Sequence, residues 1–185
     1  MKIEFADSFW RSLREMGVRD RPLNRAWRFA TRTLPRFFSN VWRFRGELAG
    51  HEWWDYSHTL AMMRRSLAIV RDGLESRGQE VPETRLPKVA KITRAIEILD
   101  NILLSRHVEM AESRLGPVYP GLLEGTITEE QSGHNSRVYA LAREIEESEW
   151  SELFRILEGQ DAKTFAPGQD WAEWFDGSGM RGWWD

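Results

Sequence analysis

The chain has 185 residues, a formal net charge of −3 and no cysteine, so disulfides, thiolate zinc sites, iron–sulfur clusters and a cysteine nucleophile are excluded. Its length suits one domain, and its ten tryptophans exceed what one small core needs, so some are expected to face a ligand or a partner. The acidic start and the lack of any run near 18 apolar residues argue against a signal peptide and a membrane span, and predict a cytoplasmic protein without a membrane partner.

Residues 1–50 are predicted to form short helices rich in arginine and aromatic side chains. Pro35 is expected to restart a helix, because proline is tolerated in a first helical turn, and Phe38, Val41 and Trp42 follow at three- and four-residue steps. This segment holds eleven Lys or Arg against five Asp or Glu, whereas residues 121–185 hold five against fourteen. The two ends are therefore expected to attract each other, within one chain or in an oligomer.

Residues 55–106 carry the clearest helical pattern. From Tyr56 to Leu74, apolar residues step by three and four, and Gly78 is the predicted end of this helix. A second apolar stripe runs from Leu86 to Leu103, after a turn at residues 81–84. Two helices, over 55–77 and 84–106, are therefore predicted to form an antiparallel hairpin at the centre of the core.

The remaining chain predicts one more long helix and an aromatic tail. An acidic helix is expected over 132–159, with Val138 and Ala142 inward and the stripe then rotating to Leu153 and Phe154. Residues 170–185 contain four tryptophans and are expected to pack back on the domain or on a neighbouring subunit. No alternation long enough for a sheet appears. We thus predict an all-α single domain over residues 1–185 that self-associates.

Four stretches resemble a family of uncharacterised bacteriophage proteins. They are Phe37-Phe38-Ser39-Asn40-Val41-Trp42-Arg43-Phe44, Trp53-Trp54-Asp55-Tyr56-Ser57, the turn at residues 78–81, and the ending Gly-Ser-Gly-Met-Arg-Gly-Trp-Trp-Asp. The likeness covers most of the chain. The family brings no assigned reaction or ligand. The resemblance implies a viral gene expressed in the host bacterial cytoplasm and favours an accessory role, such as interference with host defence.

Two patterns could hold a metal, and each has a simpler interpretation. His51, Asp55 and His58 step by four and three, but the helix is expected to begin at Asp55, which would act as its cap. Two carboxylate pairs could bind magnesium for nucleotide hydrolysis, although acidic residues on a polar helix face are usually only solvated. These pairs are Glu97 with Asp100 and Glu144 with Glu147.

Arginines interleaved with aromatics suit an anionic ligand such as a nucleotide, because guanidinium groups bind phosphates and aromatic faces stack on bases. Alternatively, arginine stems cover apolar helix surface while Trp27 and Trp42 lie in the core. Duplex DNA is not expected, because the chain is acidic and has no groove-reading motif. The candidate ligand-binding residues are Arg28, Arg32, Arg36, Trp42, Arg43, Arg45, Trp53 and Arg181.

Three functions follow from these patterns. The first is a non-enzymatic phage protein that sequesters a nucleotide signal of host defence, with no cofactor and no catalytic residue. The second is an inhibitor of a host protein, or a virion component, that acts through the Trp-rich tail. The third is a magnesium-dependent nucleotide hydrolase built on the carboxylate pairs.

Overall fold

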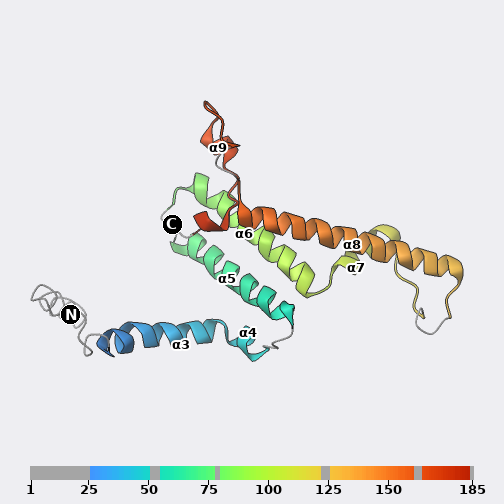
Figure 1. Cartoon of the computed structure of the whole chain (residues 1–185), viewed down its shortest axis with the longest axis horizontal. Coiled ribbons are helices and arrows are strands. Elements are labelled where there is room, and N and C mark those ends of the chain that lie inside the picture. The colour runs from blue at the N-terminus through green and yellow to red at the C-terminus, as the bar shows by residue number, and fades with distance from the viewer. Residues whose placement is uncertain (1–25, 51–54, 78–79, 122–125, 161–163, 184–185) are drawn as a thin grey trace, which may run out of the picture. The chain divides into compact units, whose positions relative to one another are not determined.

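A computed structural model describes residues 26–50, 55–77, 80–121, 126–160 and 164–183 (Figure 1). These residues form helices joined by turns and loops, with no strand among them, which confirms the all-α class. The chain divides into two units, residues 1–51 and 52–185, which we describe separately. His51 of the possible metal triad and Trp53 lie outside the described residues.

The first unit contains the π-helix η1 (Phe29–Thr33) and the helices α3 (Leu34–Arg43) and α4 (Arg45–Ala49). Pro35 lies in the first turn of α3, where its missing N–H breaks no helical hydrogen bond. The helix stops at Phe44, and α4 begins immediately after it. Trp27 and Trp42 are not core residues here, because their exposed fractions are 46% and 68%.

The second unit is built on the helices α5 (Tyr56–Arg77) and α6 (Pro82–Leu103), which pack against each other as predicted. Asp55 caps α5, since the backbone N–H of Ser57 donates to its carboxylate at 2.8 Å. The two predicted apolar stripes supply most of the core, but the residues that begin them, Tyr56 and Leu86, are 66% and 60% exposed. Several members of the stripes are buried. They include Leu60, Leu67, Leu74, Ile92, Ile96 and Leu99.

The predicted bounds of the second hairpin helix need correction. The helix starts at Pro82, not at residue 84, because proline opens a helix well at its first position. It ends at Leu103, and residues 104–106 form a turn in which Ser105 has a φ of +52°. Helix α7 (His107–Leu115) follows, so residues 104–106, predicted to end the second hairpin helix, instead connect two helices.

Helix α8 (Glu129–Glu158) packs against α6 and α7. It begins three residues before the predicted start, because Thr128 and Gln131 form a capping box. Val138, Ala142 and Leu153 are buried as expected. Phe154 is not, with 61% of its surface exposed, and Ile156 fills the core in its place.

The C-terminal segment contains α9 (Trp171–Trp174) and the 3₁₀ turn η3 (Met180–Gly182). Trp183 is 1% exposed and belongs to the same core cluster as Leu67, Ile92 and Leu153. Among the described residues, no helix has the length and apolar character needed to cross a membrane.

Candidate functional site

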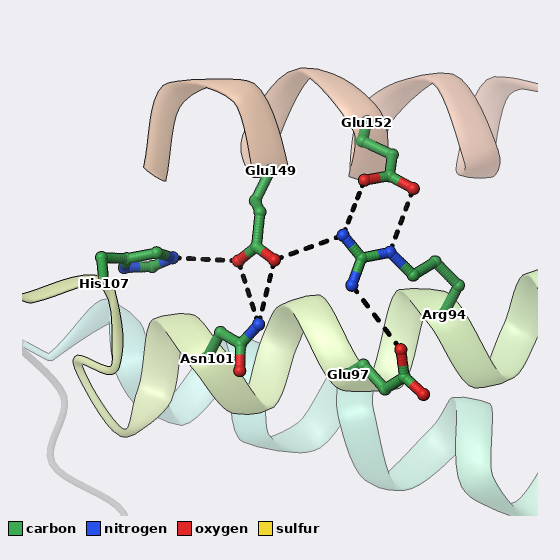
Figure 2. Close-up of polar contacts among 6 residues, drawn as sticks. All are labelled: Arg94, Glu97, Asn101, His107, Glu149 and Glu152. Atoms are coloured by element: carbon green, nitrogen blue, oxygen red, sulfur yellow. Dashed lines mark hydrogen bonds and ion pairs between the residues drawn. The ribbon is translucent and has the colours of Figure 1, made fainter. Parts of the chain in front are cut away.

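A buried carboxylate joins three helices in the second unit. Glu149 on α8 accepts hydrogen bonds from Nδ2 of Asn101, at 2.9 and 3.2 Å to its two oxygens. It also accepts from Nε2 of His107 at 3.0 Å and from a guanidinium nitrogen of Arg94 at 3.3 Å. Figure 2 shows these donors converging on the one carboxylate. Because Glu149 and His107 are almost fully buried, this network holds α6, α7 and α8 together.

Arg94 extends the same network toward the surface (Figure 2). Its guanidinium donates two parallel hydrogen bonds to Glu152, at 3.0 and 2.8 Å, and lies 3.6 Å from Glu97. The hydrogen bonds to Glu152, joined by the charges of Glu152 and Glu149 and opposed by burial, raise the pKa of Arg94. In return, the hydrogen bonds from Arg94 outweigh burial and lower the pKa of Glu152.

These contacts bear on the magnesium hypothesis. Glu97 pairs with Arg94, and Asp100 receives a hydrogen bond of 3.1 Å from Arg64. Glu144 and Glu147 lie exposed on α8. Over the described ranges, no three acidic or histidine side chains are grouped in a way that could hold a metal ion. The Arg64–Asp100 pair joins α5 to α6, whereas the Arg94–Glu97 pair lies within α6.

A cavity of about 360 Å³ lies between the start of α6 and the C-terminal segment. Its aromatic walls are Trp171, Phe175 and Trp183. Its polar wall comes from Glu80, Thr84 and Lys88, and its remaining lining comes from Ser178, Gly179 and Gly182. This size and this mixture of walls are typical of small-ligand sites, where apolar surfaces surround a few placed polar groups.

The polar wall contains a largely buried ion pair. Nζ of Lys88 lies 2.9 Å from Oε1 of Glu80, and the two side chains are only 10% and 16% exposed. The hydroxyl of Thr84 donates to the other oxygen of Glu80 at 3.1 Å. An ammonium has three N–H bonds and a carboxylate has four lone-pair sites, so this pair can offer a ligand both a donor and an acceptor.

The aromatic wall is formed by a parallel pair of rings. Trp171 and Phe175 stack with their centroids 4.5 Å apart and an interplanar angle of 10°. Trp171 is 44% exposed and Phe175 is half-buried, so the pair remains accessible to solvent. Trp183 is buried, and its indole N–H donates to the carbonyl of Gly177 at 2.9 Å.

Close backbone contacts hold the cavity wall against the helices. Gly177 lies against the backbone of Pro87 and Lys88, and the N–H of Gly179 donates to the carbonyl of Ile156 at 2.8 Å. Asp176 pairs with Lys91 at 2.9 Å. Burial would raise the pKa of Asp176, but the hydrogen bonds from Ser178 and the charge of Lys91 together lower it. The cavity wall is therefore fixed at several points.

The sequence-predicted site residues that the structure describes fall in both units. Arg28, Arg32, Arg36, Trp42, Arg43 and Arg45 belong to the first unit, whereas Arg181 is exposed on η3. Among these residues, Trp42 and Arg45 are in contact: the guanidinium of Arg45 lies 4.2 Å from the centre of the Trp42 ring. Arg45 also donates to the carbonyl of Trp42 at 2.7 Å.

Sequence reasoning missed the Lys88–Glu80 pair and the role of Glu149. Lys88 follows Glu80 by eight residues, and Glu80 precedes the start of α6. Helical spacing therefore does not predict their contact. One signal was present for the cavity: glycines at 177, 179 and 182 beside tryptophans indicate close backbone packing around large rings. Comparisons of the chain with protein-family models, curated proteins and solved structures found no match.

Proposed function

We propose that this chain is a non-enzymatic binding protein that holds a planar heteroaromatic ligand of the nucleobase type in the cavity between α6 and the C-terminal segment. The observation that carries the proposal is the largely buried Lys88–Glu80 pair, which lines the same cavity as the stacked rings of Trp171 and Phe175. A bacteriophage accessory role, in which a nucleotide signal is sequestered, fits this activity.

The chemistry of the cavity favours a neutral ring over an anion. Lys88 and Glu80 largely cancel each other's charge, so the pair provides no net positive charge to attract a carboxylate or phosphate. A lactam edge, with a carbonyl beside a ring N–H, matches the pair: the carbonyl accepts from Lys88 and the N–H donates to Glu80. Uracil and guanine present such an edge.

The walls add stacking and size selection. A flat base can stack on the exposed side of the Trp171–Phe175 pair, a contact worth about 1–3 kcal/mol per base in proteins. The volume of about 360 Å³ falls near the lower end for ligand sites, which suits a nucleoside-sized molecule better than a large one.

Arg181 gives this proposal its phosphate contact. It lies between Gly179 and Gly182, which line the cavity, and it is exposed. A base bound in the cavity would place its sugar and phosphate toward solvent, where a guanidinium can bind phosphate oxygens in pairs. Of the residues predicted from the sequence, Arg181 is thus the one that this site would use.

Titration calorimetry with UMP, GMP, AMP and CMP tests the proposal. Tighter binding of UMP or GMP than of AMP or CMP is expected, with loss of this preference in Lys88→Met and Glu80→Gln. Arg181→Gln should weaken nucleotide binding but leave uridine binding unchanged. Arg137→Gln, an exposed arginine on α8, is the matched control.

Two results would contradict the proposal. One is equal affinity in Lys88→Met and the parent protein, and the other is no heat of binding for any of the four nucleotides with a folded sample. Formation of a new phosphorus species in ³¹P spectra would instead identify an enzyme.

A further inference from the structure

The first unit presents a helical segment with two chemically different faces. We call residues 29–49, from η1 to α4, the arm. Within α3, apolar side chains at positions i, i+3, i+4, i+7 and i+8 fall on one face of the helix. They are Leu34, Phe37, Phe38, Val41 and Trp42.

The opposite face of α3 carries arginine. Arg36 and Arg43 are seven residues apart, which is two helical turns, so they share one face. That face lies across the helix from Phe37 and Phe38. The arm contains four arginines and one glutamate, in a chain whose total charge is −3. The arm therefore concentrates positive charge in an otherwise acidic protein.

The apolar face of the arm is largely exposed. The exposed fractions are 58% for Phe37, 64% for Phe38 and 68% for Trp42. Large contiguous apolar patches on soluble proteins mark surfaces that contact another protein or a membrane. The arm thus needs an apolar partner on one face and tolerates water or anions on the other.

We propose that the arm lies on the surface of an anionic lipid bilayer. Helices that bind bilayers in this way carry Trp, Phe and Leu on one face and Lys or Arg on the other, and have low net hydrophobicity. The aromatic face would enter the boundary between headgroups and acyl chains. The long arginine stems allow the guanidinium groups to reach lipid phosphates beside the helix.

Trp42, on the apolar face of α3, contacts the side chain of Arg45, the first residue of α4. Its guanidinium is 4.2 Å from the ring centre, so an apolar ring and a charge are held at the same level. Tryptophan favours the headgroup level of bilayers for the same reason, because its ring is apolar and its N–H is polar.

The separation of the faces favours lipid over a nucleic acid strand or a protein groove. A strand would need the stacking rings and the arginines on one side of the helix. A protein groove would cover the aromatic face but leave Arg36 on the side away from the contact. Headgroups, by contrast, surround the flanks of a helix that lies among them. The expectation of no membrane partner rested on the lack of a spanning segment, which surface binding does not require.

Flotation of the full-length protein with vesicles tests the proposal. Vesicles of phosphatidylcholine alone are compared with vesicles that also contain phosphatidylglycerol. We expect binding to the anionic vesicles, weakened by salt, and a loss of at least tenfold in Phe38→Ala/Trp42→Ala. Arg36→Gln/Arg43→Gln should lose about fivefold for each arginine. Phe154→Ala, an exposed phenylalanine on α8, should bind like the parent protein.

Several outcomes would overturn the proposal. They are no binding to anionic vesicles by a protein with helical circular dichroism, equal binding of the parent and Phe38→Ala/Trp42→Ala, and equal binding to both vesicle types. Sedimentation velocity adds a further one: a dimer that Phe38→Ala/Trp42→Ala abolishes, without vesicle binding, would make a second copy the partner. None of these results concerns the cavity, which the nucleotide titrations test separately.

Discussion

A β-carbon on Gly177 would lie 2.2 Å from the carbonyl carbon of Pro87. No side chain fits in that space, so the backbone of the C-terminal segment touches the backbone of α6 directly. Gly177 also has a φ of +82°, which other residues rarely adopt. Gly177 is therefore required both for the close approach to Pro87 and for the positive φ, and the position of the cavity wall depends on it.

Gly177→Ala is expected to lower the free energy of unfolding by more than about 3 kcal/mol, or to release the C-terminal segment from α6. Gly168→Ala is the matched control, since its φ is +86° but nothing lies within 4 Å of its added β-carbon. It should cost only about 1 kcal/mol of backbone strain. Urea unfolding followed by circular dichroism compares the two, and equal losses would contradict the contact with Pro87.

Glu149→Ala should destabilise the second unit by about 3 kcal/mol, because Asn101 and His107 would lose their buried acceptor. Glu147→Ala, two residues earlier on the same helix and exposed, should change stability by less than about 0.5 kcal/mol. Thermal unfolding should separate the two variants by roughly 6–12 °C. Similar melting temperatures would show that the network adds little to folding.

Acid should weaken the Arg94–Glu152 contact. The pKa of Glu152 in the folded protein is lowered below its ordinary value of 4.5 by the hydrogen bonds from Arg94. The stabilisation is therefore complete above about pH 4.5 and is lost as the pH falls through the lower folded pKa. Glu152→Gln should be less stable than the parent near neutral pH, and the difference should shrink in acid. A difference that stays constant to the most acidic pH at which the parent folds would contradict this assignment.

Magnesium should leave the protein's melting temperature unchanged. Glu97 and Asp100 are paired with Arg94 and Arg64, so a cation would have to displace an arginine. Differential scanning calorimetry with magnesium chloride, against sodium chloride of equal ionic strength, makes the comparison. A rise that depends on magnesium and disappears in Asp100→Asn would support the hydrolase hypothesis instead.

The hairpin of α5 and α6 could be predicted because its signal is local and repeated. Each apolar step from Leu60 to Leu74 adds to the same face, and tertiary packing has only to cover it. The start of α8 was misplaced because the capping box at Thr128 and Gln131 precedes the apolar residues on which the prediction was based. Helix ends depend on single hydrogen bonds, which periodicity does not show.

The inward face of α8 was harder to predict, because both α6 and α7 pack against it. In its C-terminal third the helix buries a carboxylate, Glu149, and also Ile156, while Phe154 remains exposed. Sequence rules place phenylalanine inside and glutamate outside. Only the donors on α6 and α7, which lie far away in the sequence, make a buried glutamate stable.

The aromatic side chains within residues 170–185 differ in burial and in what they contact. Trp183 fills the core, whereas Trp171 lines a cavity and remains partly exposed. Composition indicates that such rings will be buried by the protein, a ligand or a partner. It does not show which ring the turns at the glycines will place in the core. The cavity could not be predicted for the same reason, because its walls come from segments separated by most of the second unit.

The burial of Trp183 has a consequence for synthesis in the cell. The α5–α6 hairpin leaves the ribosome early, but the ring that completes its core arrives only when residue 183 emerges. At about 5–20 residues per second, the nascent hairpin spends several seconds with part of its apolar surface uncovered. During that interval it is a natural client for chaperones, and a message truncated before residue 183 would yield a chain that proteases can readily degrade.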